Sequence, residues 1–413
     1  MDATADIPTT DIATADIAIA GTGHTALTAA LVLARAVPHW RIALLGGADA
    51  GGGADPRVTV LAAGSREIFA QLGIWPGLAA RAAPILDIRI DEHAAPAWAS
   101  LGRVSAADAF GHVIENPVLS ATLAAAVAAL PNVERLPAVT GTPRPAADHI
   151  AVPVAGAILK ARLLIAADGT NSPLRGMLGI DVDARDYGTT ALLATLALEA
   201  SHGGLAFEHF TASGPLALLP LPARDGRERM ALVWVLPPRR AAELAALAPE
   251  RRLAELHAAL PRGAAAVTAM GAPALVPLRR IRACEQVRSR LVLAGNAAHS
   301  LHPVAGQGFN LTVRDLAALA QQLRESAAAG GDPGELRVLS AYARGRERDQ
   351  QRTQIFSETL PALFARPELP LRLGRQLGLI ALDRLPPLRR AVARFGAGLS
   401  LPAHRVVDAD PRL

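Results

Sequence analysis

The residues best suited to chemistry lie in the stretch from Leu291 to Leu323, which reads LVLAGNAAHSLHPVAGQGFNLTVRDLAALAQQL. It begins as an apolar, strand-like run, passes through a loop rich in glycine, and takes on helical leucine spacing from Phe309. The free N–H groups in the first turn of a helix favour an anion or a developing negative charge. Gly306 and Gly308 would let a flat ligand approach the backbone without meeting a Cβ. This stretch therefore predicts a ligand site at a helix N-terminus.

An ordinary loop before a capped helix is the alternative interpretation. It leaves four residues without an obvious packing role, namely His299, Pro303, Gln307 and Asn310. We predict no metal site on His299 and His302, because no carboxylate-rich segment accompanies these two histidines. We expect them to shape the pocket or its loop instead.

A second glycine motif lies near the N-terminus. Residues 16–45 have the pattern strand, helix, strand, and GTGHTA at 21–26 forms the turn between the first strand and the helix. This is the G-x-G-x-x-A form of the dinucleotide-binding fingerprint, in which the glycines admit a pyrophosphate to the helix N-terminus. The motif alone is weak evidence, but its flanking strands strengthen it.

One part of this fingerprint is missing. The acidic residue that would close the second strand and hold the ribose hydroxyls is replaced by Gly46-Gly47, and Asp49 is the nearest candidate. His24 is also bulky for the turn. We therefore expect the adenosine end of a dinucleotide to be held differently or more weakly.

A third segment, LLIAADGTNSPLR at 163–175, ends an apolar strand in Asp168 and Gly169. A carboxylate at the end of a buried strand can accept hydrogen bonds from ligand hydroxyls, and the glycine keeps the turn open. The alternative is a plain Asp-Gly turn. Arg57, which follows a glycine-rich loop, has two equally supported interpretations: a pyrophosphate contact or a solvent-exposed side chain.

Composition excludes several classes of function. The 413-residue chain has a net charge of +5, only 3% aromatic residues and arginines spread along its length, so we predict no nucleic-acid binding. Cys284 is the only cysteine, which excludes an internal disulfide and fits a reducing compartment. The first fifteen residues lack the basic region of a signal peptide, and no long uncharged apolar stretch predicts a transmembrane helix. We therefore expect a cytoplasmic protein.

Taken together, the three motifs resemble those of a known family. GTGHTA at 21–26, ADGTNSPLR at 167–175 and GNAAHSLHPVAGQGFN at 295–310 look like the motifs of the single-component FAD-dependent aromatic hydroxylases. Within that family the chain is most similar to the ubiquinone-biosynthesis branch, the 2-polyprenyl-6-methoxyphenol hydroxylases. Three further segments carry this similarity, at 57–75, 204–221 and 363–385.

The resemblance implies an enzyme that reduces FAD with NADH or NADPH, adds O2 to form a flavin hydroperoxide, and transfers one oxygen to the ring of a polyprenylated phenol. The cofactor carries the difficult step, so no catalytic triad or metal is needed, and we assign no side chain as catalytic. Pro303, Gly306 and Gln307 are implied to lie nearest the flavin. The residues implied to bind the cofactor are Gly21, Gly23, Ala26, Arg57, Asp168, Gly169, Arg175, Gly295, Asn296, Gly306, Gln307, Gly308 and Asn310.

The family usually has aspartate where this chain has Asn296, a variant that the ubiquinone branch tolerates. The substitution removes one negative charge near the place where reduced flavin would be anionic.

We predict an α/β fold: a Rossmann-like FAD-binding domain with an inserted, mainly antiparallel substrate-binding sheet and a C-terminal helical segment. Short alternating runs separated by Pro and Gly indicate the inserted sheet. The expected division is a flexible tail at 1–15, FAD-binding parts at 16–82, 106–180 and 283–330, substrate-domain strands at 83–105, the substrate-binding sheet at 181–282, and a helical region at 331–413, interrupted by prolines at 361, 367, 370, 386 and 387.

Residues 363–398 combine seven arginines with interleaved leucines. This pattern favours a helix that contacts a membrane surface or a partner in ubiquinone biosynthesis, which would place the protein at the inner face of the membrane. A helical layer covering the flavin domain is the equally supported alternative. Two alternatives to the assigned function also stay open: a hydroxylase for a soluble aromatic compound, and a non-catalytic assembly subunit suggested by the missing acid at Gly46 and by His24.

Overall fold

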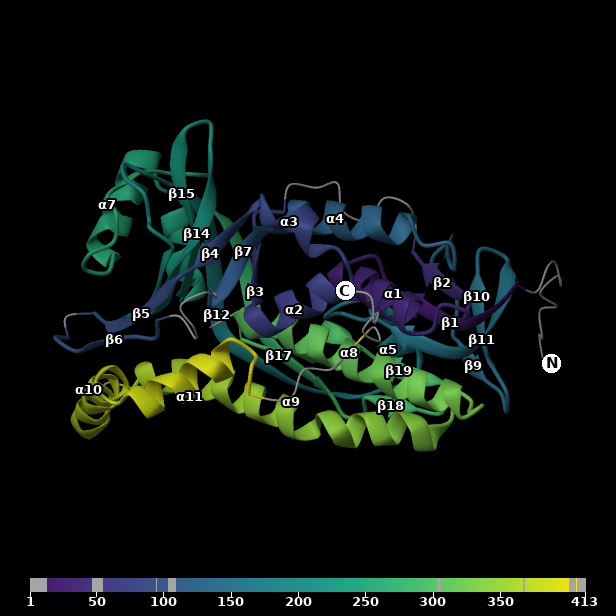
Figure 1. The fold of residues 1–413 in the computed structure, drawn as a ribbon. Helices are drawn as coiled ribbons and strands as arrows, with labels where there is room; N and C mark the ends of the chain where they lie inside the picture. Colours follow the sequence, from purple (N-terminus) through teal and green to yellow (C-terminus); the bar gives the residue numbers. More distant parts are fainter. Residues whose placement is uncertain are drawn as a thin grey trace, which may run out of the picture.

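The computed structural model describes residues 13–46, 55–93, 95–102, 109–302, 306–366, 368–400 and 406. Its first sheet is mainly parallel, with the strand order β18-β19-β11-β1-β2-β8 (Figure 1). Ile17 and Ile19 pack on one face of this sheet, and Ala18 and Ala20 pack on the other, so both faces are buried. The strands are β1 (Ala13–Ala20), β2 (Ile42–Leu45), β8 (Val133–Leu136), β11 (Ala157–Ala166), β18 (Val287–Arg288) and β19 (Leu291–Leu293), with β9 (Arg144–Pro145) and β10 (Ile150–Val154) joined through β11.

Helices cover the face that carries Ile17 and Ile19. The first, α1, is buried along almost its whole length because its alanines allow close packing on the sheet. Its neighbours α4 and α8 pack against it, and α9 packs on the outer side of α8 (Figure 1). The bounds are α1 (His24–Ala36), α4 (Asn116–Ala128), α8 (Gln307–Ala328) and α9 (Leu336–Phe364).

The second sheet has the order β20-β17-β12-β15-β14-β13-β5-β6, with β16 added beside β12. Its strands pair antiparallel except for β13 and β5, which run parallel. One face is closed by α6 (Pro238–Ala246) and α7 (Pro249–Ala259) over a leucine-rich core. The strands are β5 (Asp87–Glu92), β6 (Trp98–Ser100), β12 (Val182–Leu198), β13 (Leu205–Thr211), β14 (Gly214–Arg224), β15 (Arg227–Leu236), β16 (Val267–Met270), β17 (Ala274–Ala283) and β20 (His299–Ser300).

A small third sheet, ordered β3-β7-β4, lies between the two large ones (Figure 1). It consists of β3 (Val58–Ala62), β7 (Gly111–Glu115) and β4 (Ala82–Ile85), and α2 (Ala63–Gln71) and α3 (Trp75–Ala79) follow β3 in the chain. The expected α/β class with an antiparallel sheet and a C-terminal helical segment is thus confirmed.

The C-terminal prolines do not all act as breaks. Pro361 lies inside α9, which continues to Phe364, so the expected interruption at 361 is wrong. The proline removes one backbone hydrogen bond to the preceding turn, but its own carbonyl still accepts from the N–H of Ala365 at 2.9 Å. Pro370 and Pro387 lie in the first turns of α10 (Leu369–Arg384) and α11 (Pro386–Gly396), where a missing N–H costs little. None of the helices in the described part of the chain has the length and apolar character that a bilayer crossing requires.

Candidate active site

The three glycine motifs meet at the carboxyl ends of β1, β11 and β19. The backbone N–H of Ala167 donates to Ala20 O at 2.8 Å, and that of Ala294 donates to Ala166 O at 2.9 Å. A Cβ on Gly21 would lie 2.3 Å from Ala167 O, because the turns after β1 and β11 touch there. At this position φ is +135°, which also favours glycine.

The third motif packs against the first. A Cβ on Gly295, whose φ is +59°, would lie 2.5 Å from Thr25 Oγ1. Gly295 begins the short helix η1 (Gly295–Ala297), and Asn296 beside it is exposed and makes no side-chain hydrogen bond within the described residues. Ala26 is fully buried in the first turn of α1, where it lets the helix pack closely.

Two glycines at helix N-termini face open space. A Cβ on Gly23 or on Gly308 would meet no atom within 4 Å. Gly23 and Gly306 cap α1 and α8, and neither helix begins with a side-chain cap, so the first-turn N–H groups are available to a ligand. Two free helix N-termini with open backbone beside them fit the pyrophosphate and the ring of a dinucleotide such as FAD.

The backbone at Gly46, where the fingerprint usually has an acidic residue, is closely packed. A Cβ on Gly46 would come 2.2 Å from the Thr22 methyl group, so the Thr22 side chain occupies the place of the missing acidic side chain. Gly47 and Asp49 lie outside the described residues, as does Pro303.

His24 is accommodated by contacts with two neighbouring helices. Its Nε2 lies 2.7 Å from Ser120 Oγ on α4, and its ring meets the edge of Phe309. Burial lowers the pKa of His24 below its usual value, so the ring is neutral near pH 7. The imidazole of His24 therefore links α1, α4 and α8.

Asp168 and Arg175 hold the second motif together. Asp168 accepts hydrogen bonds from Ser172 Oγ at 2.5 Å and from the backbone N–H of Leu174 at 3.0 Å, at the start of α5 (Pro173–Met177). Arg175 is buried and donates to Ala297 O at 2.9 Å, which links the second motif to the third. Gly169 has φ +90° and no neighbour within 4 Å of an added Cβ, so the turn is open.

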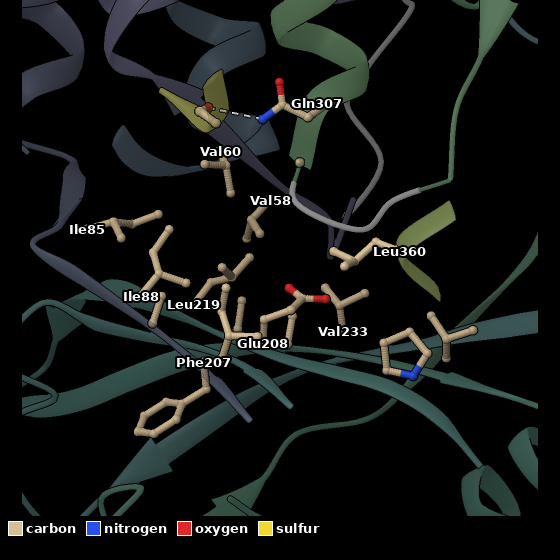
Figure 2. Close-up of a pocket in the computed structure, with 18 of the residues that line it drawn as sticks. Val58, Val60, Ile85, Ile88, Phe207, Glu208, Leu219, Val233, Gln307 and Leu360 are labelled. Atoms are coloured by element: carbon tan, nitrogen blue, oxygen red, sulfur yellow. Dashed lines mark hydrogen bonds between the residues drawn. The ribbon is translucent and has the colours of Figure 1, made fainter. Parts of the chain in front are cut away.

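Asn310 and Gln307, which the resemblance implies to be cofactor contacts, use their side chains for hydrogen bonds within the protein. Asn310 is fully buried, and its side chain bonds to the backbone of Ala62, Val60 and Gly306. Gln307 donates through Nε2 to Gly396 O at 3.1 Å (Figure 2). These hydrogen bonds hold α8 against β3 and α11. Gly306 lets the start of α8 approach β3 closely, because a Cβ added at this position would lie only 2.9 Å from the Cβ of Val60.

Arg57 lies at the mouth of the site with its side chain 60% exposed and paired with Asp55 at 2.8 Å. Asp55 also accepts from Asn116 Nδ2 at 2.9 Å. The ion pair holds the guanidinium in place without burying it, so Arg57 remains able to meet an anion.

The histidines of the third motif have structural partners. His299 Nε2 lies 2.9 Å from Asp315 Oδ2, and Arg346 donates to Asp315 Oδ1 at 2.6 Å. Burial lowers the pKa of His302 to about 4, and its ring meets that of Tyr187. Among the described residues, no group of three or more His, Cys, Asp or Glu side chains is placed to hold a metal ion.

A cavity of about 500 Å³ opens between the N-terminus of α8 and the second sheet (Figure 2). Gly306, Gln307 and Gly308 form part of its wall, and aliphatic side chains form most of the rest. Glu208 on β13 projects into this apolar space (Figure 2). No sequence motif marks Glu208; its one signal is that it is the only acidic residue of the strand LAFEHFT.

Comparison with known proteins defines the class. Residues 14–356 match the family described as FAD binding domain. The chain belongs to this family, and within it to the FAD-dependent aromatic monooxygenases that include the ubiquinone hydroxylases. "Ubiquinone hydroxylase UbiL" of Rhodospirillum rubrum is 32% identical over 348 residues, which cover 84% of this chain and 80% of the relative. "3-demethoxyubiquinol 3-hydroxylase" of Escherichia coli is also 32% identical, over 84% of this chain and 88% of that protein.

Solved structures share the fold at lower identity. The p-nitrophenol 4-monooxygenase PnpA of Pseudomonas putida superposes with a TM-score of 0.76 at 20% identity, covering 92% of this chain and 97% of that one. PqsL of P. aeruginosa, in complex with 2-aminobenzoylacetate, gives a TM-score of 0.71 at 22% identity over 89% of this chain and 99% of that one. These two likenesses concern the fold alone.

Proposed function

We propose that this protein hydroxylates the aromatic ring of a polyprenylated phenol in ubiquinone biosynthesis, with NADH or NADPH as reductant. The observation that carries the proposal is the large apolar cavity that adjoins the glycines at the N-terminus of α8. A phenol with an aliphatic tail needs such a wall, and the two relatives named as ubiquinone hydroxylases support the same substrate class.

We assign the cofactor contacts by fit. Gly21, Gly23 and the N-terminus of α1 would hold the pyrophosphate of FAD, with Arg57 beside it. Gly308 and the N-terminus of α8 would face the flavin ring and stabilise negative charge on it. When bound, FAD supplies the reduction and oxygen-transfer chemistry.

The protein's own part is to position the ring and exclude water. Side chains of β3, β14 and β15 line the cavity, among them Val58, Leu219 and Val233 (Figure 2). Phe356, Leu360 and Leu379 close it from α9 and α10. A dry wall of this kind keeps water from the reacting atoms.

The proposal is tested in two steps. Purified protein reconstituted with FAD should show a flavin spectrum that bleaches with NADH or NADPH, and absence of bound flavin would contradict the cofactor assignment. A deletion strain should then accumulate a prenylated phenol lacking one ring hydroxyl. An unchanged quinone pool would instead favour a soluble aromatic substrate, the alternative within the same enzyme class.

We further propose that α10 contacts an anionic membrane surface. Leu369, Leu373, Leu377 and Ile380 are between 45% and 67% exposed and recur at helical spacing. On its other side the same helix lines the cavity with Leu379 and Leu382. The helix therefore lies between the outer surface and the cavity. Arginines at 366, 372, 384, 389 and 390 flank the apolar stripe and suit acidic headgroups.

A further inference from the structure

Glu208 is directed into the cavity by strand alternation on β13. Phe207 and His209 take the opposite side, where Phe207 packs in the leucine-rich core under α6 and α7 and His209 bonds to Asp91. On the neighbouring strands, Ala217 and Ile90 stand beside Glu208 in register. Figure 2 shows its carboxylate among Leu219, Val233 and Leu360, opposite the Gln307 end of α8.

This carboxylate has no partner within the described residues: no hydrogen bond or ion pair joins it to another side chain or to the backbone. Among the described residues of the cavity wall, Arg57 is the other ionisable one, and it is paired with Asp55. The surrounding elements carry four ion pairs: Arg89 with Asp91, Glu115 with Arg229, Glu358 with Arg280, and Arg375 with Glu92.

Burial raises the pKa of Glu208 to about 7. A carboxyl group without a partner in an apolar site is costly, and aliphatic residues would fill the same space at lower cost. The position is therefore suited to a polar group that arrives with a ligand. In a cavity that is otherwise aliphatic, the hydroxyl of a phenol is such a group.

We propose that Glu208 binds the phenolic hydroxyl of the substrate and accepts its proton. This inference rests on the proposed phenol hydroxylation. The O–H bond of the phenol breaks, its proton bonds to a carboxylate oxygen of Glu208, and the electron pair stays on the phenol oxygen. The resulting phenolate makes the ring carbons ortho and para to it more electron-rich, which favours attack on an electrophilic oxygen.

Matched ligands test the contact on the FAD-loaded protein. The probes are 2-methoxy-6-prenylphenol and its methyl ether, which keeps the ring and tail but has no proton to donate. We expect the wild type to bind the phenol at least ~10-fold more tightly than the ether, since a hydrogen bond to a charged group is worth about this factor. The preference should grow as pH rises through the range in which Glu208 ionises.

Glu208→Met keeps the volume and removes the acceptor, so it should bind the two probes equally. Glu208→Gln should bind both but lose the pH dependence of the preference. Glu199→Gln, which alters an exposed carboxylate in the bend directly after β12, serves as the control and should match the wild type. Equal affinity of the wild type for both probes, or a preference that survives in Glu208→Met, would overturn the proposal.

Turnover separates this inference from the function on which it rests. Oxygen incorporation into the phenol should fall ~100-fold or more in Glu208→Gln, as expected for loss of a general base. If the wild type prefers the phenol through Glu208 but adds no oxygen to it, the hydroxylase proposal fails and the Glu208 contact stands. If the wild type hydroxylates the phenol and Glu208→Gln does so at the same rate, the proton-accepting role fails and the hydroxylase proposal stands.

Discussion

The side-chain oxygen of Asn310 accepts a hydrogen bond from the backbone N–H of Ala62 at 2.9 Å, across 248 positions of sequence. Its amide nitrogen donates to Val60 O at 2.7 Å and to Gly306 O at 2.8 Å. One buried side chain thus joins β3 to the N-terminus of α8, the two elements that bring the cavity to the glycines.

Asn310→Ala should destabilise the protein by about 2–4 kcal/mol, because it leaves a buried N–H and two carbonyl oxygens with fewer partners. Chemical unfolding of the wild type and variant measures this difference. Asn171→Ala, at an exposed position, should change stability little. Equal losses for the two variants would contradict the supporting role of Asn310.

Gly308→Val should fold normally yet bind FAD ~100-fold more weakly, since open space surrounds the new side chain until the ring arrives. Flavin titration of the apoprotein gives the dissociation constant. Gly345→Val, on the exposed side of α9 with equally open surroundings, is the matched control for helix propensity. We expect Asp49→Ala to cost less affinity than Gly308→Val, and full flavin occupancy in Gly308→Val would refute our placement of the ring.

Glu208 should make stability depend on pH. Burial raises its pKa from the ordinary 4.5 to about 7. The protonated group therefore contributes its full share of stability below pH 4.5, and this contribution is lost as pH rises through 7. Glu208→Gln should therefore be more stable than the wild type at pH 8, by up to about 3 kcal/mol, and nearly equal to it at pH 4.5. Thermal unfolding of the apoproteins at both pH values measures this. A difference that stays constant with pH would show that the carboxylate is not desolvated.

Asp315 should make stability depend on pH in the opposite direction from Glu208. Burial alone would raise its pKa, but the His299 hydrogen bond and the Arg346 charge hold the pKa below its usual value. The ionised Asp315 therefore stabilises the fold at pH values above the ordinary carboxyl pKa. This stabilisation is lost as pH falls through the lowered pKa of Asp315. Asp315→Asn should cost on the order of 3 kcal/mol at pH 7, because it leaves buried Arg346 with one fewer partner.

The control for Asp315 is Asp183→Asn, which removes a half-exposed partner of Arg280. Exposed pairs contribute about 0–1 kcal/mol, so this loss should be small. Asp315 lies on α8 and Arg346 on α9. If Asp315→Asn is no more destabilising at pH 7 than Asp183→Asn, the buried pair does not stabilise the packing of these two helices.

The α10 proposal predicts vesicle binding. The protein should float with vesicles that contain phosphatidylglycerol and not with pure phosphatidylcholine vesicles, because the arginines need acidic headgroups. Replacing both Leu373 and Leu377 with Glu should abolish flotation. Met177→Glu, which alters an exposed apolar side chain on α5, should leave it unchanged. Flotation that survives the double substitution would exclude α10 as the contact.

The sequence by itself determined the three glycine motifs and the elements that carry them. Gly21 and Gly295 have φ values of +135° and +59°, which favour glycine. The continuous apolar run of β1 and the 3.6-residue period of α8 also depend only on neighbouring residues. Such features can be recognised from one sequence because their physical causes are local.

Only the tertiary structure decided which polar residues face a ligand and which support the fold. Asn310 bonds to a strand 248 positions away, and Thr22 occupies the place of the acid that is missing at Gly46. Glu208 is distinguished by the aliphatic walls that β3, β14 and α9 place around it. Burial and the presence of a partner are properties of packed, distant segments, so no pattern along the chain could have separated these roles.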